Sequence, residues 1–183
     1  MTIALVGGLI ALILLFLDLA SKAVAFAVNV HQPNMFLGIV RLDCVMNSGI
    51  AWGTFGENPP AMLAITILTA FMAAGIVVLF FTYFKHNTPA RIALAAIEAG
   101  AIGNFVDRIY FGEVRDFIEI DFLLPHYTCN FADMCIVLGA IALIFIILFI
   151  GKEAAFPLTK KWREESKLEE ELRREKKAKK AKK

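Results

Sequence analysis

The sequence has few of the groups that metal, redox or nucleic-acid proteins need. Its three cysteines show neither a Cys-x-x-Cys pair nor a Cys/His spacing, which excludes the usual zinc and iron–sulfur frameworks. It also has no His-Glu-x-x-His motif, the common signature of zinc peptidases. The first 151 residues hold six Lys and Arg against 10 Asp and Glu, with no basic patch interleaved with aromatics, so nucleic-acid binding is not expected. We expect no metal or organic cofactor.

Apolar side chains, by contrast, are in excess. Hydrophobic residues make up 58% of the 183 residues and the mean hydropathy is +0.66, whereas soluble domains contain about 45–50% apolar residues. A membrane core of about 30 Å needs about 20 apolar residues per helix. The sequence therefore predicts an all-α membrane protein, with four transmembrane helices at about residues 3–28, 61–84, 92–109 and 134–151.

The charged residues are concentrated at the C-terminal end. Residues 152–183 hold 13 of the 19 Lys and Arg, so we separate this charged tail from a membrane domain at residues 1–151. Basic residues near the ends of spans stay in the cytoplasm, which predicts that both termini are cytoplasmic. The first span lacks a basic segment before it and a cleavage site after it, so we expect it to be retained.

The segments that face outward under this topology contain strand patterns. Apolar and charged residues alternate at 39–44 and 118–122, with the period of a half-buried strand. We expect a small periplasmic β-sheet or cradle there, and a short interfacial helix or turn near Pro59 and Pro60. Cys44 and Cys129 both fall in outward segments, where either a disulfide or two buried thiols would fit.

Ionisable residues occur inside the predicted spans, where each costs about 2.5–3.5 kcal/mol on insertion scales. Asp18 and Lys22 stand four residues apart and share a helical face, as an ion pair would. Asn104, Asp107 and Arg108 share a face of the third span, and the glycines around them would let a neighbouring backbone approach. These residues form either structural pairs or the wall of a polar cavity.

Two further carboxylates lie at the outer membrane boundary, Asp116 on a loop and Asp133 at the start of the fourth span. Singly, each is explained as a surface carboxylate or as an acid favoured by a helix N-terminus. Together, and beside the amide cluster, they resemble a carboxylate pair that shares one proton and activates water for peptide hydrolysis. Ser21 and Ser48 have no histidine at a suggestive spacing.

Five sequence blocks resemble, in order, those of the lipoprotein signal peptidase (signal peptidase II) family. Asp18–Lys22 resembles the family's D-x-x-[ST]-K, and Asn47–Gly53 resembles N-x-G-x-A-F, with Trp52 in place of phenylalanine. Gly100–Arg108 resembles G-x-x-G-N-x-x-D-R, Gly112–Phe117 resembles G-x-V-x-D-F, and Asn130–Asp133 resembles N-x-A-D. The resemblance covers about residues 1–151 and leaves out the tail.

This resemblance implies a monomeric aspartic endopeptidase of the bacterial inner membrane. Its substrate would be a diacylglyceryl-modified prolipoprotein, cut before the lipidated cysteine near the outer face of the membrane, among membrane lipids. The resemblance implies that Asp116 and Asp133 form the catalytic dyad. It also implies a set of residues that shape the site or bind substrate: Asp18, Lys22, Asn47, Gly49, Asn104, Asp107, Arg108, Asn130 and Ala132.

Two other functions fit the same residues. A small-solute transporter would line a pathway with the intramembrane charges, among them Glu98, for which the sequence gives no other role; such proteins often show repeats, and none is seen here. A non-catalytic lipoprotein-binding membrane protein would keep the fold without the reaction. An intramembrane protease of the Gly-x-Gly-Asp type is disfavoured, because neither Asp116 nor Asp133 follows Gly-x-Gly.

Overall fold

The computed structural model describes residues 2–35, 39–49, 58–82, 84, 87–121, 127–150 and 154–181. Within them the chain forms two compact units, Met1–Ala140 and Ile141–Lys183. The elements are, in order, α1 (Thr2–Ala27), β1 (His31–Met35), β2 (Val40–Asn47), α2 (Pro59–Phe81), α3 (Thr88–Phe111), β3 (Val114–Ile120), β4 (Tyr127–Cys129), α4 (Phe131–Phe149) and α5 (Lys160–Ala181).

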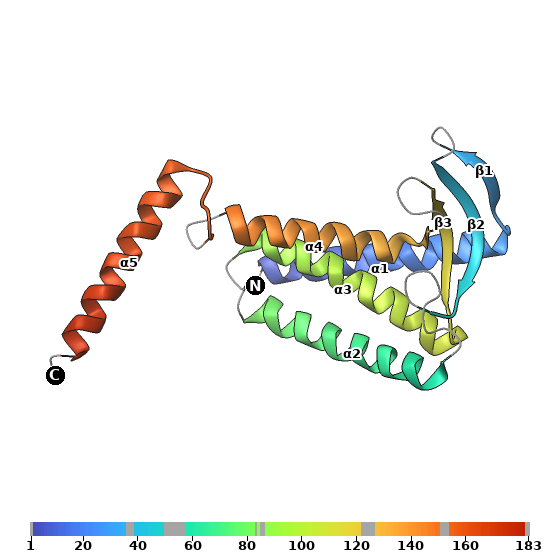
Figure 1. Ribbon diagram of the computed structural model, residues 1–183, viewed down its shortest axis with the longest axis horizontal. Helices are drawn as coiled ribbons and strands as arrows, with labels where there is room; N and C mark the ends of the chain where they lie inside the picture. The colour runs from blue at the N-terminus through green and yellow to red at the C-terminus, as the bar shows by residue number, and fades with distance from the viewer. Residues whose placement is uncertain are drawn as a thin grey trace. The chain divides into compact units, whose positions relative to one another are not determined.

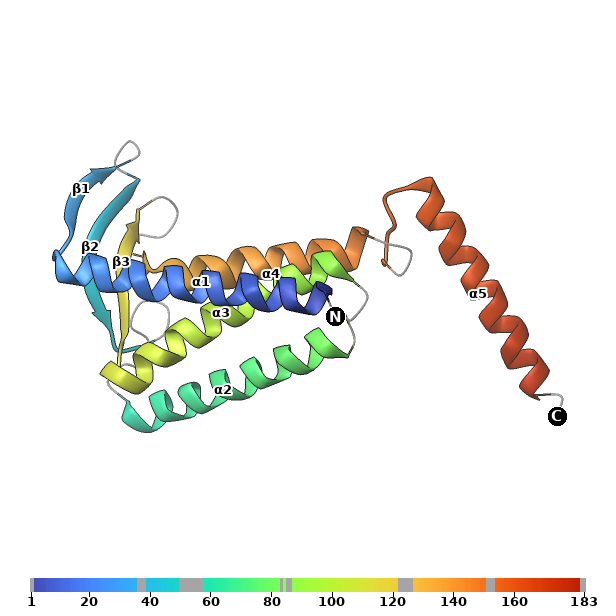
Figure 2. The same cartoon turned by 180° about the vertical axis from the view of Figure 1, so that it is seen from behind.

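Helix α3 is the centre of the first unit, lying between α1 and α2 (Figure 1 and Figure 2). Two glycines of α3 allow its close contacts. A Cβ at Gly100 would overlap the backbone carbonyl of Ala132, and one at Gly103 would overlap the carboxylate of Asp18. The sequence-based expectation that these glycines admit a neighbouring backbone is confirmed at Gly100, whereas Gly103 makes room for the side chain of Asp18. Helix α1 and the start of α4 both reach α3 at these positions.

Three helices are long and apolar enough to cross a membrane: residues Leu5–Ala27 of α1, all of α2, and all of α4. Helix α3 has 24 residues and is not among the three. It carries Arg91, Glu98, Asp107 and Arg108, and its charged side chains at Arg91 and Asp107 are buried against other parts of the protein. The described chain is thus a helical membrane protein with three candidate spans.

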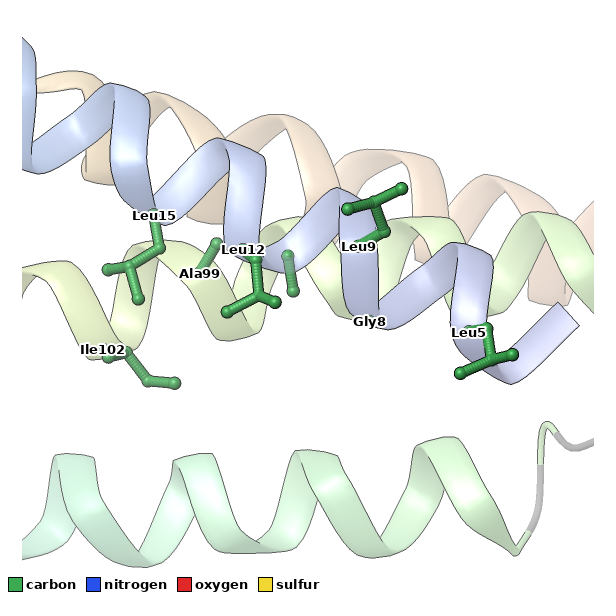
Figure 3. A pocket seen from close by; sticks show the side chains of 8 residues that line it. Leu5, Gly8, Leu9, Leu12, Leu15, Ala99 and Ile102 are labelled. Atoms are coloured by element: carbon green, nitrogen blue, oxygen red, sulfur yellow. The ribbon is translucent and has the colours of Figure 1, made fainter. Parts of the chain in front are cut away.

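An apolar groove is lined by residues of α1 and α3 (Figure 3). Its volume is about 490 Å³ and no charged side chain lines it. The groove therefore offers packing surface and no reactive group. Its lining residues are Leu5, Gly8, Leu9, Ala11, Leu12, Leu15, Ala99 and Ile102.

The strands form one antiparallel sheet in the order β1-β2-β3-β4, at the end of the helices where α1 finishes (Figure 1). The two strands expected from the alternating patterns are confirmed as β2 and β3, whereas β1 and β4 were not expected. Arg41 lies opposite Glu119 in the register and its guanidinium binds both that carboxylate and that of Asp121. Such cross-strand charge pairs help fix the register.

The chain near Pro59 and Pro60 differs from the expectation. Instead of a separate interfacial helix or turn, these prolines form the first turn of α2, and the side chain of Asn58 accepts the backbone N–H of Ala61 at 3.0 Å. Proline is favoured there because the first helical N–H groups have no intrahelical partner. Residues 50–57, which include Trp52 of the second sequence block, lie outside the described part of the chain.

The cysteine alternatives are resolved in favour of thiols, because Cys44, Cys129 and Cys135 are all free. Cys129 and Cys135 are buried, and the Cys44 thiol donates to the carbonyl of Ala25 at 3.3 Å. Cys44 is on β2 and Cys129 on β4, with β3 between them. The intervening strand accounts for the missing disulfide.

Candidate active site

Asp116 and Asp133 line the same pocket, a cavity of about 200 Å³. Asp116 is in β3, opposite Val45 of β2, and is 1% exposed. Asp133 is in the first turn of α4. The sheet and a helix N-terminus therefore each supply one carboxylate. The other lining residues are Asn47, Gly49, Asn104, Arg108, Val114, Tyr127 and Thr128.

Side-chain amides connect the two carboxylates. The Asn130 amide donates to Oδ1 of Asp116 at 2.7 Å and to Oδ1 of Asn104 at 3.1 Å. The Asn104 amide in turn donates to Oδ1 of Asp133 at 2.7 Å. Asn47 adds a second donor to Asp116, at Oδ2 and 2.9 Å. Neutral donors thus orient both carboxylates without supplying a counter-charge.

The position of Asp133 is also fixed by the start of α4. Asn130 accepts the Asp133 backbone N–H at 3.1 Å, and Asp133 accepts the Asn130 backbone N–H at 3.0 Å. This reciprocal arrangement is that of a capping box, which satisfies two N–H groups that a helix leaves unpaired. The Asn-x-x-Asp spacing thus both starts the helix and fixes the position of the Asp133 carboxylate.

Lys22 lies beneath these residues and is completely buried. Its ammonium donates to Asp18 at 2.8 Å and to the Oδ1 of Asn104 at 3.0 Å, and it lies 3.3 Å from Asp107. Three neighbours match the three donors of an ammonium group. The ion pair expected from the spacing of Asp18 and Lys22 is therefore part of a larger network.

Asp18 and Asp107 each hold a second element in place. Asp18 accepts the backbone N–H of Ala132 at 2.8 Å, which attaches α1 to the first turn of α4. Asp107 accepts the backbone N–H of Arg115 at 3.0 Å and its guanidinium at 2.8 and 3.2 Å. Because Arg115 precedes Asp116 in β3, this clamp fixes the strand next to the pocket carboxylate.

Arg108 is the cationic side chain among the pocket residues. It donates to the carbonyl of Gly49 at 3.3 Å, and its Nε has no partner within the described residues. Gly49 itself donates its N–H to Asn47 at 3.0 Å. The guanidinium therefore reaches across the pocket to the turn that follows β2.

Burial raises the pKa of Asp116 above its usual value, although the hydrogen bonds from Asn47 and Asn130 act in the opposite direction. Burial, with the charges of Asp133 and Asp116, raises the pKa of Cys129 to about 12. Cys129 therefore stays a thiol at neutral pH and is a poor nucleophile. Burial also raises the pKa of Tyr127, which keeps its hydroxyl protonated.

The network brings together all of the residues expected to act at the site, from Asp18 to Asp133. Three pocket residues were missed: Val114, Tyr127 and Thr128. Thr128 donates to Oδ2 of Asp116 at 3.4 Å. Tyr127 and Thr128 belong to the three-residue strand β4, which is too short to show alternation, although their position just before Asn130 was a usable signal.

Glu98 is not part of the pocket, and its Oε2 is buried without a hydrogen-bond partner within the described residues. Among all the residues that the structure describes, no group of three or more His, Cys, Asp or Glu side chains is arranged to hold a metal ion.

Comparisons with known proteins agree on one family. The family model described as signal peptidase (SPase) II matches residues 10–149. The lipoprotein signal peptidase of Moorella thermoacetica is 33% identical over 151 residues, covering 79% of this chain and 94% of that protein. The enzyme of that name from Enterococcus faecalis is 31% identical over 150 residues, covering 80% and 89%.

Solved structures also resemble this fold. One described as a bacterial membrane enzyme superposes with a TM-score of 0.67 at 26% identity, covering 78% of this chain and 87% of that one. A second of the same description has a TM-score of 0.63 at 27% identity, covering 78% and 92%.

The buried ammonium gives a stability prediction. Lys22→Met leaves the buried carboxylate of Asp18 without its counter-charge and that of Asp107 with Arg115 alone. It should lower the free energy of unfolding by about 3–5 kcal/mol. The double variant with Asp18→Asn should lose less than the sum of the two single losses, because the two side chains interact directly. Denaturant unfolding in detergent micelles measures both. The matched control is Lys160→Met, at a lysine that is 91% exposed; a Lys22→Met variant as stable as this control would contradict the network.

Proposed function

The chain belongs to the signal peptidase II family, and we propose that Asp116 and Asp133 are the catalytic dyad of its peptidase activity. Family membership makes the protein an aspartic peptidase that removes signal peptides from prolipoproteins. One observation carries the assignment of the dyad: the two carboxylates line a single pocket and are bridged by Asn130 and Asn104.

In the proposed mechanism the two carboxylates of the dyad share one proton, so one is ionised and the other is protonated. The ionised carboxylate takes a proton from water, and the resulting hydroxide adds to the scissile carbonyl carbon as the protonated carboxyl donates to the carbonyl oxygen. Collapse of the tetrahedral intermediate breaks the C–N bond, and the leaving amine receives a proton from the dyad. The pair titrates as a unit. Burial that raises the pKa of Asp116 favours the singly protonated state.

The substrate we assign is a prolipoprotein whose cysteine carries diacylglyceryl, cut on the N-terminal side of that cysteine. The signal segment and the acyl chains of such a substrate both lie in the bilayer. The pocket lies between the ends of the spans and the sheet, which is where the peptide would leave the membrane. Arg108 lies on the pocket wall with an unpartnered Nε among the described residues. Its guanidinium and the nearby amides act as donors to the substrate backbone or to the developing oxyanion.

We place α3 as a fourth span of a membrane domain covering residues 1–151. At 24 residues it is about 36 Å long, enough to cross. Two of its four charged side chains have partners that offset the cost of burial: Arg91 donates to the carbonyl of Phe80 at 3.0 Å and lies over that ring, and Asp107 is paired with Lys22 and Arg115. Four spans put both termini in the cytoplasm and the pocket near the outer face of the inner membrane.

We also assign a monomer surrounded by lipid, because a single chain supplies every residue of the pocket. A transporter is not favoured, since the relatives are named lipoprotein signal peptidases. A non-catalytic binding protein would keep the pocket but would not depend on its carboxylates for cleavage.

The dyad predicts the effect of removing either carboxylate. Asp116→Asn and Asp133→Asn should each slow cleavage of a purified diacylglyceryl-modified prolipoprotein by at least about a hundredfold, because general acid–base catalysis contributes about that much or more. The assay is run in detergent with a chelator present. Asp43→Asn, at a half-exposed carboxylate of β2 outside the pocket, is the control that should cut normally. Cleavage at the normal rate by both pocket variants would remove the proposal.

The hydrogen bonds to Asp116 predict a pH effect. The Asn47 amide stabilises the ionised carboxylate and lowers the pKa of Asp116, so its removal raises that pKa. Asn47→Leu should move the pH optimum of kcat/KM upward by about one unit, since a hydrogen bond to a charged group is worth about 1.5 kcal/mol or more. Thr128→Val, which removes a longer bond of 3.4 Å, should shift the optimum less. An optimum that stays in place or moves down in Asn47→Leu speaks against the dyad.

The four-span topology predicts which residues a membrane-impermeant maleimide reaches. In a chain whose native cysteines are replaced by alanine, Gln32→Cys on exposed β1 should react in intact cells. Lys167→Cys on exposed α5 should react after the membrane is opened. Equal labelling of both positions in intact cells would mean an even number of spans between them and would contradict the four-span topology, which has three there.

A further inference from the structure

Helix α5 is a 22-residue helix within the charged tail. Its described side chains lie largely in solvent, and Leu168 and Leu172 are 57% and 47% exposed. Two ion pairs on α5 join residues one turn apart, Arg174 with Glu170 and Lys160 with Glu164. In proteins most helical stability comes from packing of one helix face rather than from the helix itself, so a surface that binds α5 would stabilise it.

The start of α5 is attached to the end of α4. The backbone N–H groups of Ala155, Phe156 and Leu158 donate to the carbonyls of Ile147, Leu148 and Phe149 at 3.2, 2.7 and 3.2 Å. These carbonyls belong to the last turn of α4, where a helix leaves them unpaired. Because α4 is a candidate span, the fold-back keeps the connection to α5 at the level where the span ends.

Thr159, the residue just before α5, connects this fold-back to the helix. Thr159 caps the helix by accepting the backbone N–H of Trp162 at 3.2 Å, and Arg163 donates to the carbonyl of Leu158 at 3.1 Å. Phe156 is 68% exposed and its ring lies 6.5 Å from that of Phe149. Tryptophan and tyrosine are the aromatic residues enriched at the membrane–water interface, and Trp162 lies in the first turn of α5. Helix α5 therefore begins beside the lipid headgroups.

The charges of α5 are divided along its length. Residues 160–172 contain four basic and five acidic residues, so this part is close to neutral. Residues 173–181 contain six basic residues and one acidic residue, and two more lysines follow. The positive charge is thus concentrated in the part of the helix that is farther along the chain from its attachment.

We propose that the basic part of α5 binds anionic phospholipid headgroups on the membrane surface at which α4 ends. A cluster of four to eight basic residues next to a span attracts anionic lipid, with each residue near the surface contributing. The attachment at Thr159 holds the helix near that surface, which gives lipid a high effective concentration over any soluble polyanion. Lipid is for this reason favoured over RNA, and the docked helix fixes the tail independently of the catalytic pocket.

The test is hydrogen exchange of the full chain in nanodiscs of phosphatidylcholine alone or with phosphatidylglycerol added. At low salt, amides of α5 should exchange at least about tenfold more slowly in the anionic discs, because docking stabilises the helix. Salt near 0.5 M should abolish the difference, since the Debye length falls to about 4 Å or less. Exchange at the same rate in both discs would overturn the proposal.

Two variants with six substitutions each separate basic charge from mere helix perturbation. The neutralised variant should show no difference between the two discs; it carries Arg173→Gln, Arg174→Gln, Lys176→Gln, Lys177→Gln, Lys179→Gln and Lys180→Gln. The control keeps the net charge and should retain the protection; it carries Lys160→Gln, Lys161→Gln, Lys167→Gln, Glu164→Gln, Glu165→Gln and Glu171→Gln. Protection that persists in the neutralised variant would refute the charge mechanism. Protection by added polyuridylate but not by anionic lipid would assign the tail to nucleic acid instead.

Discussion

The buried ammonium of Lys22 is the interaction on which the rest of the site depends. A charge with no exposure to solvent carries a desolvation penalty of several kcal/mol, which only well-placed partners offset. Each of its three partners also holds another part of the molecule. Asp18 binds the first turn of α4, Asp107 binds the start of β3, and Asn104 binds Asp133. One cation between α1 and α3 therefore determines where both pocket carboxylates lie.

The two pocket carboxylates, Asp116 and Asp133, have different partners from Asp18 and Asp107. Asp18 and Asp107 are each paired with a cation, Asp18 with Lys22 and Asp107 with Lys22 and Arg115. Asp116 instead accepts hydrogen bonds from neutral amides of Asn47 and Asn130, and burial keeps its pKa raised. Amides orient a carboxylate as well as cations do but stabilise its charge less, so a proton stays available for exchange within the pair. The same low-polarity surroundings keep the neighbouring Cys129 unreactive.

Much of this site could be predicted from the sequence because its signals are local. The four-residue spacing of Asp18 and Lys22 and the shared face of Asn104 and Asp107 follow from helical periodicity, and alternation identified β2 and β3. The bond from Lys22 to Asn104 joins residues 82 positions apart, and no local pattern encodes it. Strand β4 has three residues, so Tyr127 and Thr128 gave no periodic signal. Pro59 and Pro60 suggested a break in the chain, but proline is equally suited to a helix start, and tertiary packing determined the outcome. Helix α5 was not predicted, because the charged tail has too few apolar residues to show a helical period.

The bond between Asp18 and the backbone of Ala132 closes a loop of 114 residues. Because α1 precedes α4 along the chain, the carboxylate of Asp18 gains this backbone partner only once the start of α4 has been synthesised. Long-range contacts of this kind form late, because the chain must lose its loop-closure entropy first. The pocket therefore assembles only after α4 has been synthesised, because Asp133 and the N–H group that binds Asp18 both belong to that helix.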